Sequence, residues 1–521
     1  MESNTPSTWL PGGSSTSSPT PPDRIPAGHY LAGMPDPFAL PFDNRFARLH
    51  PTFYEVVDPT PLGQPYLIAF NPDAAALLDL PPDAAAHPDA AAYLSGGKRM
   101  PGAEPLAMIY AGHQFGVWVP QLGDGRAILL GQVTNSRGEH WDVQLKGSGM
   151  TRFSRMGDGR AVLRSTIREY LASEAMHGLG IPTTRALAIV GSDDPVYRET
   201  PETAATLIRL APSHIRFGSF QIFAARGQPD RSRELADHVI ERHEPDLVGR
   251  PDRHERWLER VVDRTAELMA SWMAVGFAHG VMNTDNMSVL GLTLDYGPYG
   301  FMEAYEPGFI CNHSDHEGRY AFDRQPAIGL WNLARFAESL LELVSFEAAN
   351  AALNRYPTAF DQRYGALMRS KLGLTTTDAD DTSLVGELLS LMAANRVDYT
   401  IWFRSLCAVS SDAEAAPAFL RSMAHDLERL DAWTSRYTAR LRAEKRPDPE
   451  RMAAMGRVNP KYVLRNYLAQ GAIDAALGKD YSEIESLRRV LAAPFDEHPE
   501  QARYAEPAPP WARDLVVSCS S

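Results

Sequence analysis

Side chains that can hold a metal ion and move a proton are concentrated between His279 and Gly297. Asn286 and Asp295 carry hard oxygen atoms, of the kind that Mg²⁺ takes from one or two protein groups together with nucleotide phosphates. Asp285, next to Asn286, carries a carboxylate that can accept a proton. Asn286 or Asp295 taken alone also fits a buried turn in which the side chain bonds to nearby backbone. Together the residues predict a metal-assisted group-transfer site.

The order of these residues resembles the catalytic and metal-binding segments of kinase-like phosphotransferases. Those enzymes carry His-Arg-Asp or His-Gly-Asp, then Asn after a short spacer, and later Asp-Phe-Gly. Here His-Gly-Val at 279–281 is followed by Asn286, and Asp-Tyr-Gly at 295–297 replaces Asp-Phe-Gly. Val281 stands where the catalytic Asp belongs, and it cannot accept a proton. The ordinary kinase base is therefore missing, and Asp285 is the nearby substitute.

A glycine-rich hairpin and a strand with an outward lysine precede this stretch. Gly123 and Gly125 come just before a strand-like run at 128–133. In 141–146 apolar and polar residues alternate, which places Lys146 on the face opposite the apolar side chains. This order is how the N-lobe of a kinase begins. Taken singly, Gly-Asp-Gly is also a common hairpin turn, and Lys146 fits a solvated strand lysine.

Three charged residues further along complete a candidate phosphate-binding cleft. Glu169 is expected either to hold the ammonium of Lys146 or to cap its own helix in the pattern Thr166-x-x-Glu169. Arg209, on a predicted strand, and Arg216 carry planar guanidinium groups that suit phosphate oxygens. Either arginine alone also fits an ordinary surface position.

Helical patterns dominate the remainder of the chain. Apolar residues from Leu258 to Gly276 recur at steps of three and four, which predicts a helix that leads directly to His279. Residues 74–94 predict short helices broken by prolines, and 328–493 are mostly helical in pattern. We expect an α+β protein: a protein-kinase-like bilobal fold with a β-rich N-lobe, a helical C-lobe and a large helical C-terminal extension.

The expected domain organisation has five parts. They are a disordered Ser/Pro-rich leader at 1–28, an N-terminal region with the N-lobe at 29–225, the catalytic and metal-binding part of the C-lobe at 226–330, a helical C-terminal region at 331–500, and a tail at 501–521.

Composition narrows the class of protein. The 521 residues carry a net charge of −14, which argues against binding nucleic acid through its phosphates. No apolar run approaches the roughly 18 residues of a membrane span, and no secretory signal is apparent. The three cysteines are far apart, so neither a disulfide scaffold nor a zinc cluster is expected. The expected setting is the reducing cytoplasm, with no membrane or nucleic-acid partner.

With these residues assembled, the chain resembles the selenoprotein O family of protein adenylyltransferases, pseudokinases that transfer AMP rather than phosphate. The similarity runs from about Tyr30 to the last residue. It rests on the segments Tyr-Ala-Gly-His-Gln-Phe-Gly at 110–116, Leu-Gly-Asp-Gly-Arg at 122–126, Gln-Leu-Lys-Gly-Ser-Gly at 144–149, the stretch 279–286, and Asn-Pro-Lys-Tyr-Val-Leu-Arg-Asn at 459–466.

The resemblance implies that ATP binds in reverse relative to active kinases, with the γ-phosphate buried and the α-phosphorus presented to the acceptor. It implies that Asn286 and Asp295 hold Mg²⁺ or Mn²⁺ and that Asp285 accepts the proton. The nucleotide contacts that it implies are Gly123, Gly125, Arg126, Lys146, Asp158, Gly159, Arg209, Arg216 and Asp295.

The resemblance also bears on two cysteines. Many members end in selenocysteine-Ser-Ser, and this chain has Cys519 at that position. A disulfide between positions like Cys311 and Cys519 has been proposed for such proteins. The alternative is that the two are unrelated thiols.

The expected activity is transfer of AMP from ATP to Ser, Thr or Tyr hydroxyls of proteins with release of pyrophosphate, with UMP transfer from UTP as a variant. Two alternatives stay open from the residues alone. The missing kinase base suits an inactive nucleotide-binding pseudokinase scaffold, and the His-Gly start of the loop suits a small-molecule phosphotransferase.

Overall fold

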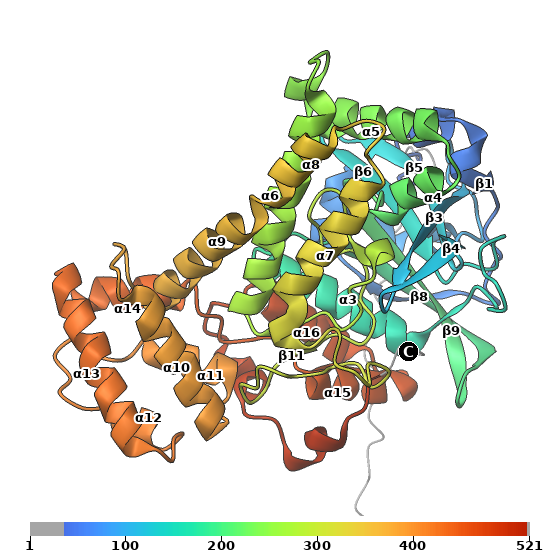
Figure 1. Ribbon diagram of the computed structural model, residues 1–521. Helices are drawn as coiled ribbons and strands as arrows, with labels where there is room; N and C mark the ends of the chain where they lie inside the picture. Colours follow the sequence, from blue (N-terminus) through green and yellow to red (C-terminus); the bar gives the residue numbers. More distant parts are fainter. Residues whose placement is uncertain (1–35, 518–521) are drawn as a thin grey trace, which may run out of the picture.

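A computed structural model describes residues 36–517 of the chain, without the side chains of Arg513 and Asp514. The predicted leader at 1–28 and Cys519 lie outside the described residues. The architecture combines one large antiparallel sheet with many helices (Figure 1). The predicted α+β class is confirmed.

The large sheet has nine strands, and every pairing between them is antiparallel. Its main path runs β1-β3-β5-β6-β9-β8-β2, while β4 pairs with β3 and β7 with β9. The strands are β1 (Tyr54–Val56), β2 (Tyr66–Phe70), β3 (Leu106–Gln114), β4 (Val117–Gly123), β5 (Ala127–Thr134), β6 (His140–Lys146), β7 (Ala161–Val162), β8 (Arg185–Tyr197) and β9 (Pro201–Ala211). A separate pair joins β10 (Phe277–Ala278) to β11 (Gly300–Phe301).

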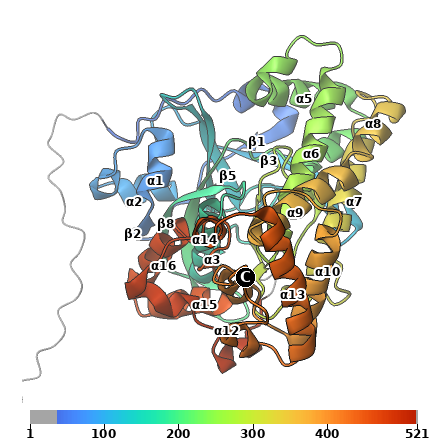
Figure 2. The ribbon, with the colours of Figure 1, turned by 90° about the vertical axis from the view of Figure 1, so that its left-hand side faces the viewer.

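The alternation in β6 explains why the sheet has one apolar and one functional face. Val143 and Leu145 are fully buried in a hydrophobic core shared with Tyr93 and Leu94. These last two belong to the short helix α2 (Ala90–Ser95), which with α1 (Pro72–Ala75) lies on one side of the sheet (Figure 2). Lys146 points to the other side, as the period-two pattern predicts.

Helix α3 (Leu163–Gly178) packs against β8 and β9 on this second side. Its N-cap is Val162, whose side chain makes no capping bond, and Thr166 bonds back to the carbonyl of Val162. The predicted capping box is therefore wrong, because the helix begins at Leu163, before Thr166. Glu169 lies well inside the helix, and its carboxylate is available for another partner.

The other helices surround the second side and extend from it. They are α4 (Gly218–Ala225), α5 (Pro229–His243), α6 (Arg253–Ala274), α7 (Gln325–Glu338), α8 (Phe346–Leu353), α9 (Tyr356–Lys371), α10 (Asp381–Asn395), α11 (Tyr399–Leu406), α12 (Ala418–Arg421), α13 (Leu427–Glu444), α14 (Asp448–Gly456), α15 (Asn466–Leu477) and α16 (Ser482–Ala492). Helices α10 to α14 project away from the sheet, at the lower left of Figure 1. None of the helices within residues 36–517 is long and apolar enough to cross a membrane.

The long helix α6 carries the predicted apolar stripe and leads into the chemistry-bearing stretch. Trp257, Leu258, Val261 and Met269 are buried in the largest hydrophobic core. After α6 the chain forms β10 and then reaches His279.

Candidate active site

A cavity of about 710 Å³ opens between the large sheet and the segment 279–298. Ten of the predicted site residues line it: Gly123, Gly125, Arg126, Lys146, Asp158, Gly159, Arg209, Asp285, Asn286 and Asp295. Two more, Glu169 and Arg216, lie behind its wall. The structure thus brings residues from positions 123 to 295 into one place.

The wall of the cavity is more basic than acidic. Six basic side chains line it against four acidic ones: Arg126, Lys146, Arg155, Arg160, Arg198 and Arg209, against Asp124, Asp158, Asp285 and Asp295. The excess of positive charge suits an anionic ligand such as a polyphosphate.

Lys146 and Glu169 form an ion pair at the inner end of the cavity. The same ammonium lies 3.4 Å from Oδ1 of Asp295. Arg209 joins the group, with Nη1 3.2 Å from Oε1 of Glu169 and in contact with Asp295. Of the two roles open to Glu169, the structure supports the ion pair with Lys146.

Three cationic side chains contact the carboxylate of Asp295. Besides Lys146 and Arg209, Arg216 places Nη1 3.1 Å from Oδ2 of Asp295. Burial alone would raise the pKa of Asp295, but the charges of Arg209, Lys146 and Arg216 outweigh it and hold the pKa well below its usual value. Asp295 is therefore ionised throughout the physiological range.

Arg216 acts from behind the cavity wall. Its guanidinium lies 4.5 Å from the ring centre of Tyr110 and donates a 2.8 Å hydrogen bond to the backbone carbonyl of Asp285. Arg216 is 2% exposed. In this arrangement it holds Asp285 and Asp295 in place, and it does not itself line the cavity.

Asp285 is buried and lines the same cavity as this charged cluster. Its Oδ2 accepts a 3.1 Å hydrogen bond from Nε2 of Gln114, while its buried Oδ1 has no hydrogen-bond partner within the described chain. Burial raises the pKa of Asp285 to about 6, with the Gln114 bond and the charge of Arg216 opposing the rise. A carboxylate with such a pKa and a spare acceptor oxygen suits a general base near neutral pH.

The turn between β3 and β4 reaches across to the loop that carries Asp285. The backbone N–H of His113 donates a 2.7 Å hydrogen bond to Oγ1 of Thr284, and that of Phe115 donates a 3.1 Å bond to Oδ1 of Asn283. A Cβ on Gly112 would lie 2.9 Å from Oδ1 of Asp285, so only glycine permits this close approach. Sequence reasoning noted this segment but assigned no role to Gln114.

Two glycine-rich loops form the outer wall and pack against each other. A Cβ on Gly125 would meet the carbonyl oxygen of Phe153 at 2.8 Å, and one on Gly159 would overlap the backbone of Gly149. Gly159 also has a φ of +70°, which favours glycine. Asp158 is engaged by Arg198 through bonds of 2.8 and 2.9 Å, a partner that sequence reasoning missed.

Asn286 and Asp295 offer the donor set of a hard metal ion. Nδ2 of Asn286 donates a 2.9 Å hydrogen bond to the carbonyl of Val281, which leaves its amide oxygen as the atom able to bind a ligand. Residues 36–517 contain no group of three or more His, Cys, Asp or Glu that could hold a metal. An ion held by Asn286 and Asp295 would therefore take further ligands from phosphates and water, as Mg²⁺ usually does.

His279 orients the loop. Its ring stacks on Trp272 with centroids 5.1 Å apart, and its Nδ1 accepts a 3.3 Å hydrogen bond from the N–H of Val281. Burial lowers the pKa of His279 to about 4, so the ring is neutral at physiological pH. These contacts give His279 a structural role in the loop.

Comparison with known proteins decides the family. Residues 37–492 match the family model described as protein adenylyltransferase SelO. The chain belongs to the SelO family of protein adenylyltransferases. The predicted family and the predicted nucleotidyltransferase class are thereby confirmed.

The alignments of this SelO-family chain with its curated relatives cover nearly the whole length of each relative. A protein nucleotidyltransferase YdiU of Thiobacillus denitrificans is 56% identical over 484 residues, which is 93% of this chain and 99% of the relative. The protein nucleotidyltransferase YdiU of Thioalkalivibrio sulfidiphilus is 57% identical, and that of Myxococcus xanthus is 56% identical, each over 92% of this chain and 99% of the relative.

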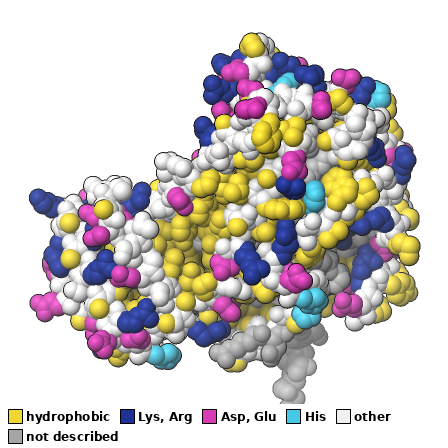
Figure 3. Space-filling view, viewed as in Figure 1, with side chains coloured by type: hydrophobic (Ala, Val, Ile, Leu, Met, Phe, Trp, Pro, Cys, Tyr) yellow, Lys and Arg dark blue, Asp and Glu magenta, His cyan; other side chains and the backbone are white. Residues whose placement is uncertain are grey.

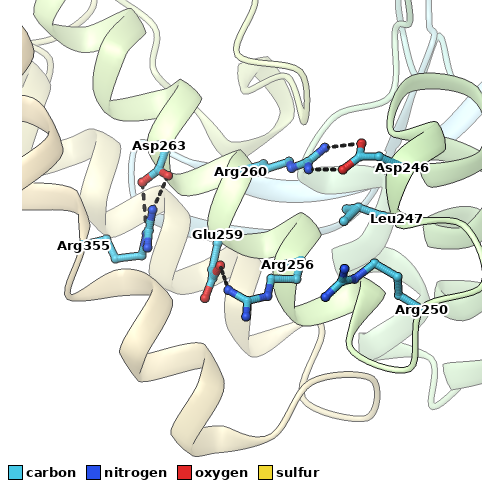
Figure 4. A pocket seen from close by; sticks show the side chains of 8 residues that line it. All are labelled: Asp246, Leu247, Arg250, Arg256, Glu259, Arg260, Asp263 and Arg355. Atoms are coloured by element: carbon cyan, nitrogen blue, oxygen red, sulfur yellow. Dashed lines mark hydrogen bonds and ion pairs between the residues drawn. The ribbon is translucent and has the colours of Figure 1, made fainter.

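The SelO-family chain also has a second charged cavity, of about 360 Å³, beside α6 (Figure 4). Four arginines line it, but each pairs with a carboxylate. The pairs are Arg250 with Asp252, Arg256 with Glu259, Arg260 with Asp246, and Arg355 with Asp263. Because its charges are already neutralised, this cavity is a weaker anion site than the first.

Cys311 of this SelO-family chain is buried close to the 279–298 segment. Its Sγ lies 2.8 Å from the carbonyl oxygen of Pro298. The N–H of His313 donates a 2.9 Å hydrogen bond to the carbonyl of Val517, so the end of the described chain lies beside this segment. Cys519 lies outside the described residues, and its pairing with Cys311 stays a prediction.

Proposed function

We propose that this SelO-family protein transfers AMP from ATP to Ser, Thr or Tyr hydroxyls of protein substrates and releases pyrophosphate. One observation carries the proposal: Asp285 lies in the same cavity as the cations around Asp295, while Val281 stands at the kinase base position. The proposed cavity therefore combines an end that binds the triphosphate with a proton acceptor at a position different from that of the kinase base.

The charged cluster favours a reversed triphosphate. Lys146, Arg209 and Arg216 bring three positive charges to the inner end of the cavity, against two carboxylates. The γ-phosphate is the most highly charged part of ATP, so we place it at this inner end. The α-phosphorus then lies further out, towards the acceptor.

Asp285 is the proposed base. Its Oδ1 accepts the proton of the attacking hydroxyl as the oxygen bonds to the α-phosphorus. The bond from that phosphorus to the pyrophosphate oxygen breaks, and Lys146 and Arg209 neutralise the charge that develops on the leaving group. Gln114 holds the carboxylate in orientation through Oδ2. Catalysis here depends on positioning and on neutralising charge.

Asn286 and Asp295 are the proposed ligands of Mg²⁺ or Mn²⁺. A divalent ion held there would supply positive charge that offsets part of the charge of the phosphates. The deprotonated state of Asp295 fits this role, since a carboxylate whose pKa is held low carries the negative charge that a cation requires at neutral pH.

We also propose a kinase-like arrangement of two lobes. Support comes from the position of the cavity, which lies between the large sheet with its glycine-rich loops and the 279–298 segment. The proposed parts keep the boundaries 29–225 for the region of the N-lobe, 226–330 for the catalytic part of the C-lobe, 331–500 for the helical extension and 501–521 for the tail. The proposed setting is the cytoplasm, where ATP is supplied.

ATP labelled on the α- or on the γ-phosphorus distinguishes AMP transfer from transfer of the terminal phosphate. The protein is incubated with ATP labelled on the α- or the γ-phosphorus, with Mg²⁺ or Mn²⁺ and a mixture of acceptor proteins. Label entering protein from α-labelled ATP, with pyrophosphate released, supports the proposal. Label arriving only from the γ position would show an ordinary kinase. ATP binding without transfer from either label would instead favour a pseudokinase scaffold.

UTP is the proposed second donor. The inner end of the cavity recognises phosphates, and these are the same in ATP and UTP. Label transfer from α-labelled UTP, reduced by competing ATP, is the expected result, and no transfer at saturating UTP would restrict the reaction to AMP.

A further inference from the structure

A surface of aromatic and basic side chains continues outwards from the cavity on to α7. We call it the Trp331 surface and define it by His113, Phe115, Trp118, Arg319, Trp331 and Arg335. On the face drawn in Figure 3, hydrophobic side chains lie among basic ones and a histidine over α7 and β4. The proposed transfer reaction does not use this surface.

Trp331 lies at its centre between two cations. The guanidinium of Arg319 lies 4.6 Å from the Trp331 ring centre, and that of Arg335 lies 5.5 Å from it. The ring of His113 meets Trp331 edge-on at 5.3 Å and lies 5.0 Å from Trp118. Tryptophan and arginine are the residues that most often dominate the binding energy of protein interfaces.

The positive charge of Arg319 is not neutralised by a carboxylate of the described chain. Arg319 takes part in none of the ion pairs of residues 36–517, and its buried Nε has no hydrogen-bond partner there. Arg335, by contrast, pairs with Glu338. Asp315 lies near in sequence, but its two oxygens accept the backbone N–H groups of Arg319 and Tyr320. A carboxylate from outside would meet an available guanidinium.

The surface is continuous with the proposed base. Phe115 lines the cavity and contacts the ring of Tyr320 at 5.1 Å. The hydroxyl of Tyr320 donates a 2.7 Å hydrogen bond to Oδ1 of Asn283, two positions before Asp285. Gly116 lies against Arg319, where an added Cβ would be 3.1 Å from the guanidinium carbon. A segment whose hydroxyl reaches Asp285 would therefore pass over Arg319.

We propose that the Trp331 surface docks the protein substrate and selects an acidic residue close to the acceptor hydroxyl. This inference rests on the proposed function and specifies its substrate class. A Glu or Asp of the substrate pairs with Arg319, while neighbouring apolar side chains pack on Trp331 and Phe115. Planar guanidinium and carboxylate groups match in a two-point contact, which gives direction as well as affinity.

Charge argues for an acidic segment of protein over other occupants. The chain has a net charge of −14, so long-range attraction does not favour nucleic acid or an anionic membrane. The positive charge on this surface is local and is set among aromatic rings. Such a surface suits a short segment with one or two carboxylates rather than a polyanion.

A peptide panel with matched variants tests the inference. Each peptide contains one Ser, Thr or Tyr hydroxyl and either Glu or Lys at one position up to about four residues away, the span that an extended chain covers at about 3.3–3.6 Å per residue. The full chain is compared with Arg319→Glu, with Trp331→Ala and with the control Arg324→Glu. Arg324 is exposed on the same segment and bonds to the carbonyl of Glu317. ATP affinity by calorimetry and thermal unfolding are measured for every variant.

For the unmodified chain, we expect kcat/KM to be at least about tenfold higher for a Glu peptide than for its Lys counterpart. Arg319→Glu should reverse this preference, Trp331→Ala should weaken transfer to every peptide, and Arg324→Glu should behave as the unmodified chain does. ATP affinity should stay constant, because Arg319, Arg324 and Trp331 do not line the nucleotide cavity.

Three results would overturn the inference. The first is equal transfer to Glu and Lys peptides by the unmodified chain. The second is a Glu preference that survives in the folded Arg319→Glu variant. The third is transfer to intact acceptor proteins but to no peptide, since a short segment would then not carry recognition. Absence of transfer to every acceptor from α-labelled ATP would instead refute the proposed function itself.

Discussion

Gln114 donates a hydrogen bond of 3.1 Å to Oδ2 of Asp285, although the two residues are 171 positions apart in the chain. The bond links the end of β3 to the loop that carries the proposed base. It also leaves the other carboxylate oxygen without a partner in the described chain. The geometry of the base therefore depends on a residue from the opposite wall of the cavity.

Removing this bond should change both rate and pH dependence. A hydrogen bond to a carboxylate stabilises its charged form, so Gln114→Ala should raise the pKa of Asp285 and move the acidic limb of the kcat/KM profile to higher pH. We expect kcat to fall by about tenfold to a hundredfold, since the carboxylate loses its orientation. Gln114→Glu, which replaces the donor with a second carboxylate, should lower the rate more than Gln114→Ala does. An unchanged profile for Gln114→Ala would show that the bond has no role.

The pH profile of the unmodified chain should reflect Asp285. Its pKa is raised to about 6 by burial, and only the deprotonated form can accept a proton. Transfer at saturating ATP should therefore rise with pH through about 6 and level off above about 7. AMP transfer measured from pH 5 to 8 checks this. A rate that is flat across that range would exclude Asp285 as the base.

The buried carboxylate of Asp285 should also lower the free energy of unfolding at neutral pH. Its folded pKa of about 6 exceeds the ordinary 3.8, so the folded protein binds more protons between these values, and the free energy of unfolding falls as pH rises through that window. Asp285→Asn should therefore raise the free energy of unfolding at pH 7 by roughly 1–3 kcal/mol while abolishing transfer. Urea unfolding at pH 4.5 and 7 measures the difference. A variant less stable than the parent at pH 7 would contradict this account.

The inner cluster should be needed for transfer. Asp295→Ala removes a proposed metal ligand and leaves Lys146, Arg209 and Arg216 without their shared carboxylate, so we expect no detectable transfer. Lys146→Ala should lower kcat/KM by about a hundredfold or more, because a charge on the leaving group is then not neutralised. Transfer from α-labelled ATP is the measurement. Undiminished activity in both folded variants would refute the site.

A remote contact should tune the same cluster. Arg168, next to Glu169 on α3, donates a 3.0 Å hydrogen bond to the carbonyl of Tyr299 and lies 4.5 Å from that ring. It also bonds to Oδ1 of Asn466 at 3.3 Å. Arg168 thus ties the helix that carries Glu169 to the segment that follows Asp295.

Arg168→Ala should therefore lower kcat more than it weakens ATP binding, by about tenfold in kcat, since the positions of Glu169 and Asp295 become less well defined. Kinetics at saturating ATP and calorimetric ATP affinity separate the two effects. Asn466→Ala should act in the same direction and less strongly. An equal loss of ATP affinity and kcat in Arg168→Ala would indicate a general structural defect instead.

Local sequence patterns locate the residues whose role depends on their neighbours in the chain. The alternation of β6 sets the face of Lys146, and the spacing of Asn286 and Asp295 places both on one loop system. Glu169 was ambiguous because the start of α3 at Leu163 is not marked by a capping side chain. The resemblance implies that Arg216 contacts the nucleotide, and no local pattern indicates that it lies behind the wall, against Tyr110.

The amino-acid sequence by itself determined the family, the α+β class and the set of charged residues available for chemistry. Only the tertiary structure decided how those charges are paired, which carboxylate keeps a spare oxygen and which arginines lack a carboxylate partner. The physical reason is that pKa and charge pairing depend on burial and on partners within a few ångströms. Those partners, such as Gln114 for Asp285 or Glu169 for Lys146, come from distant parts of the chain.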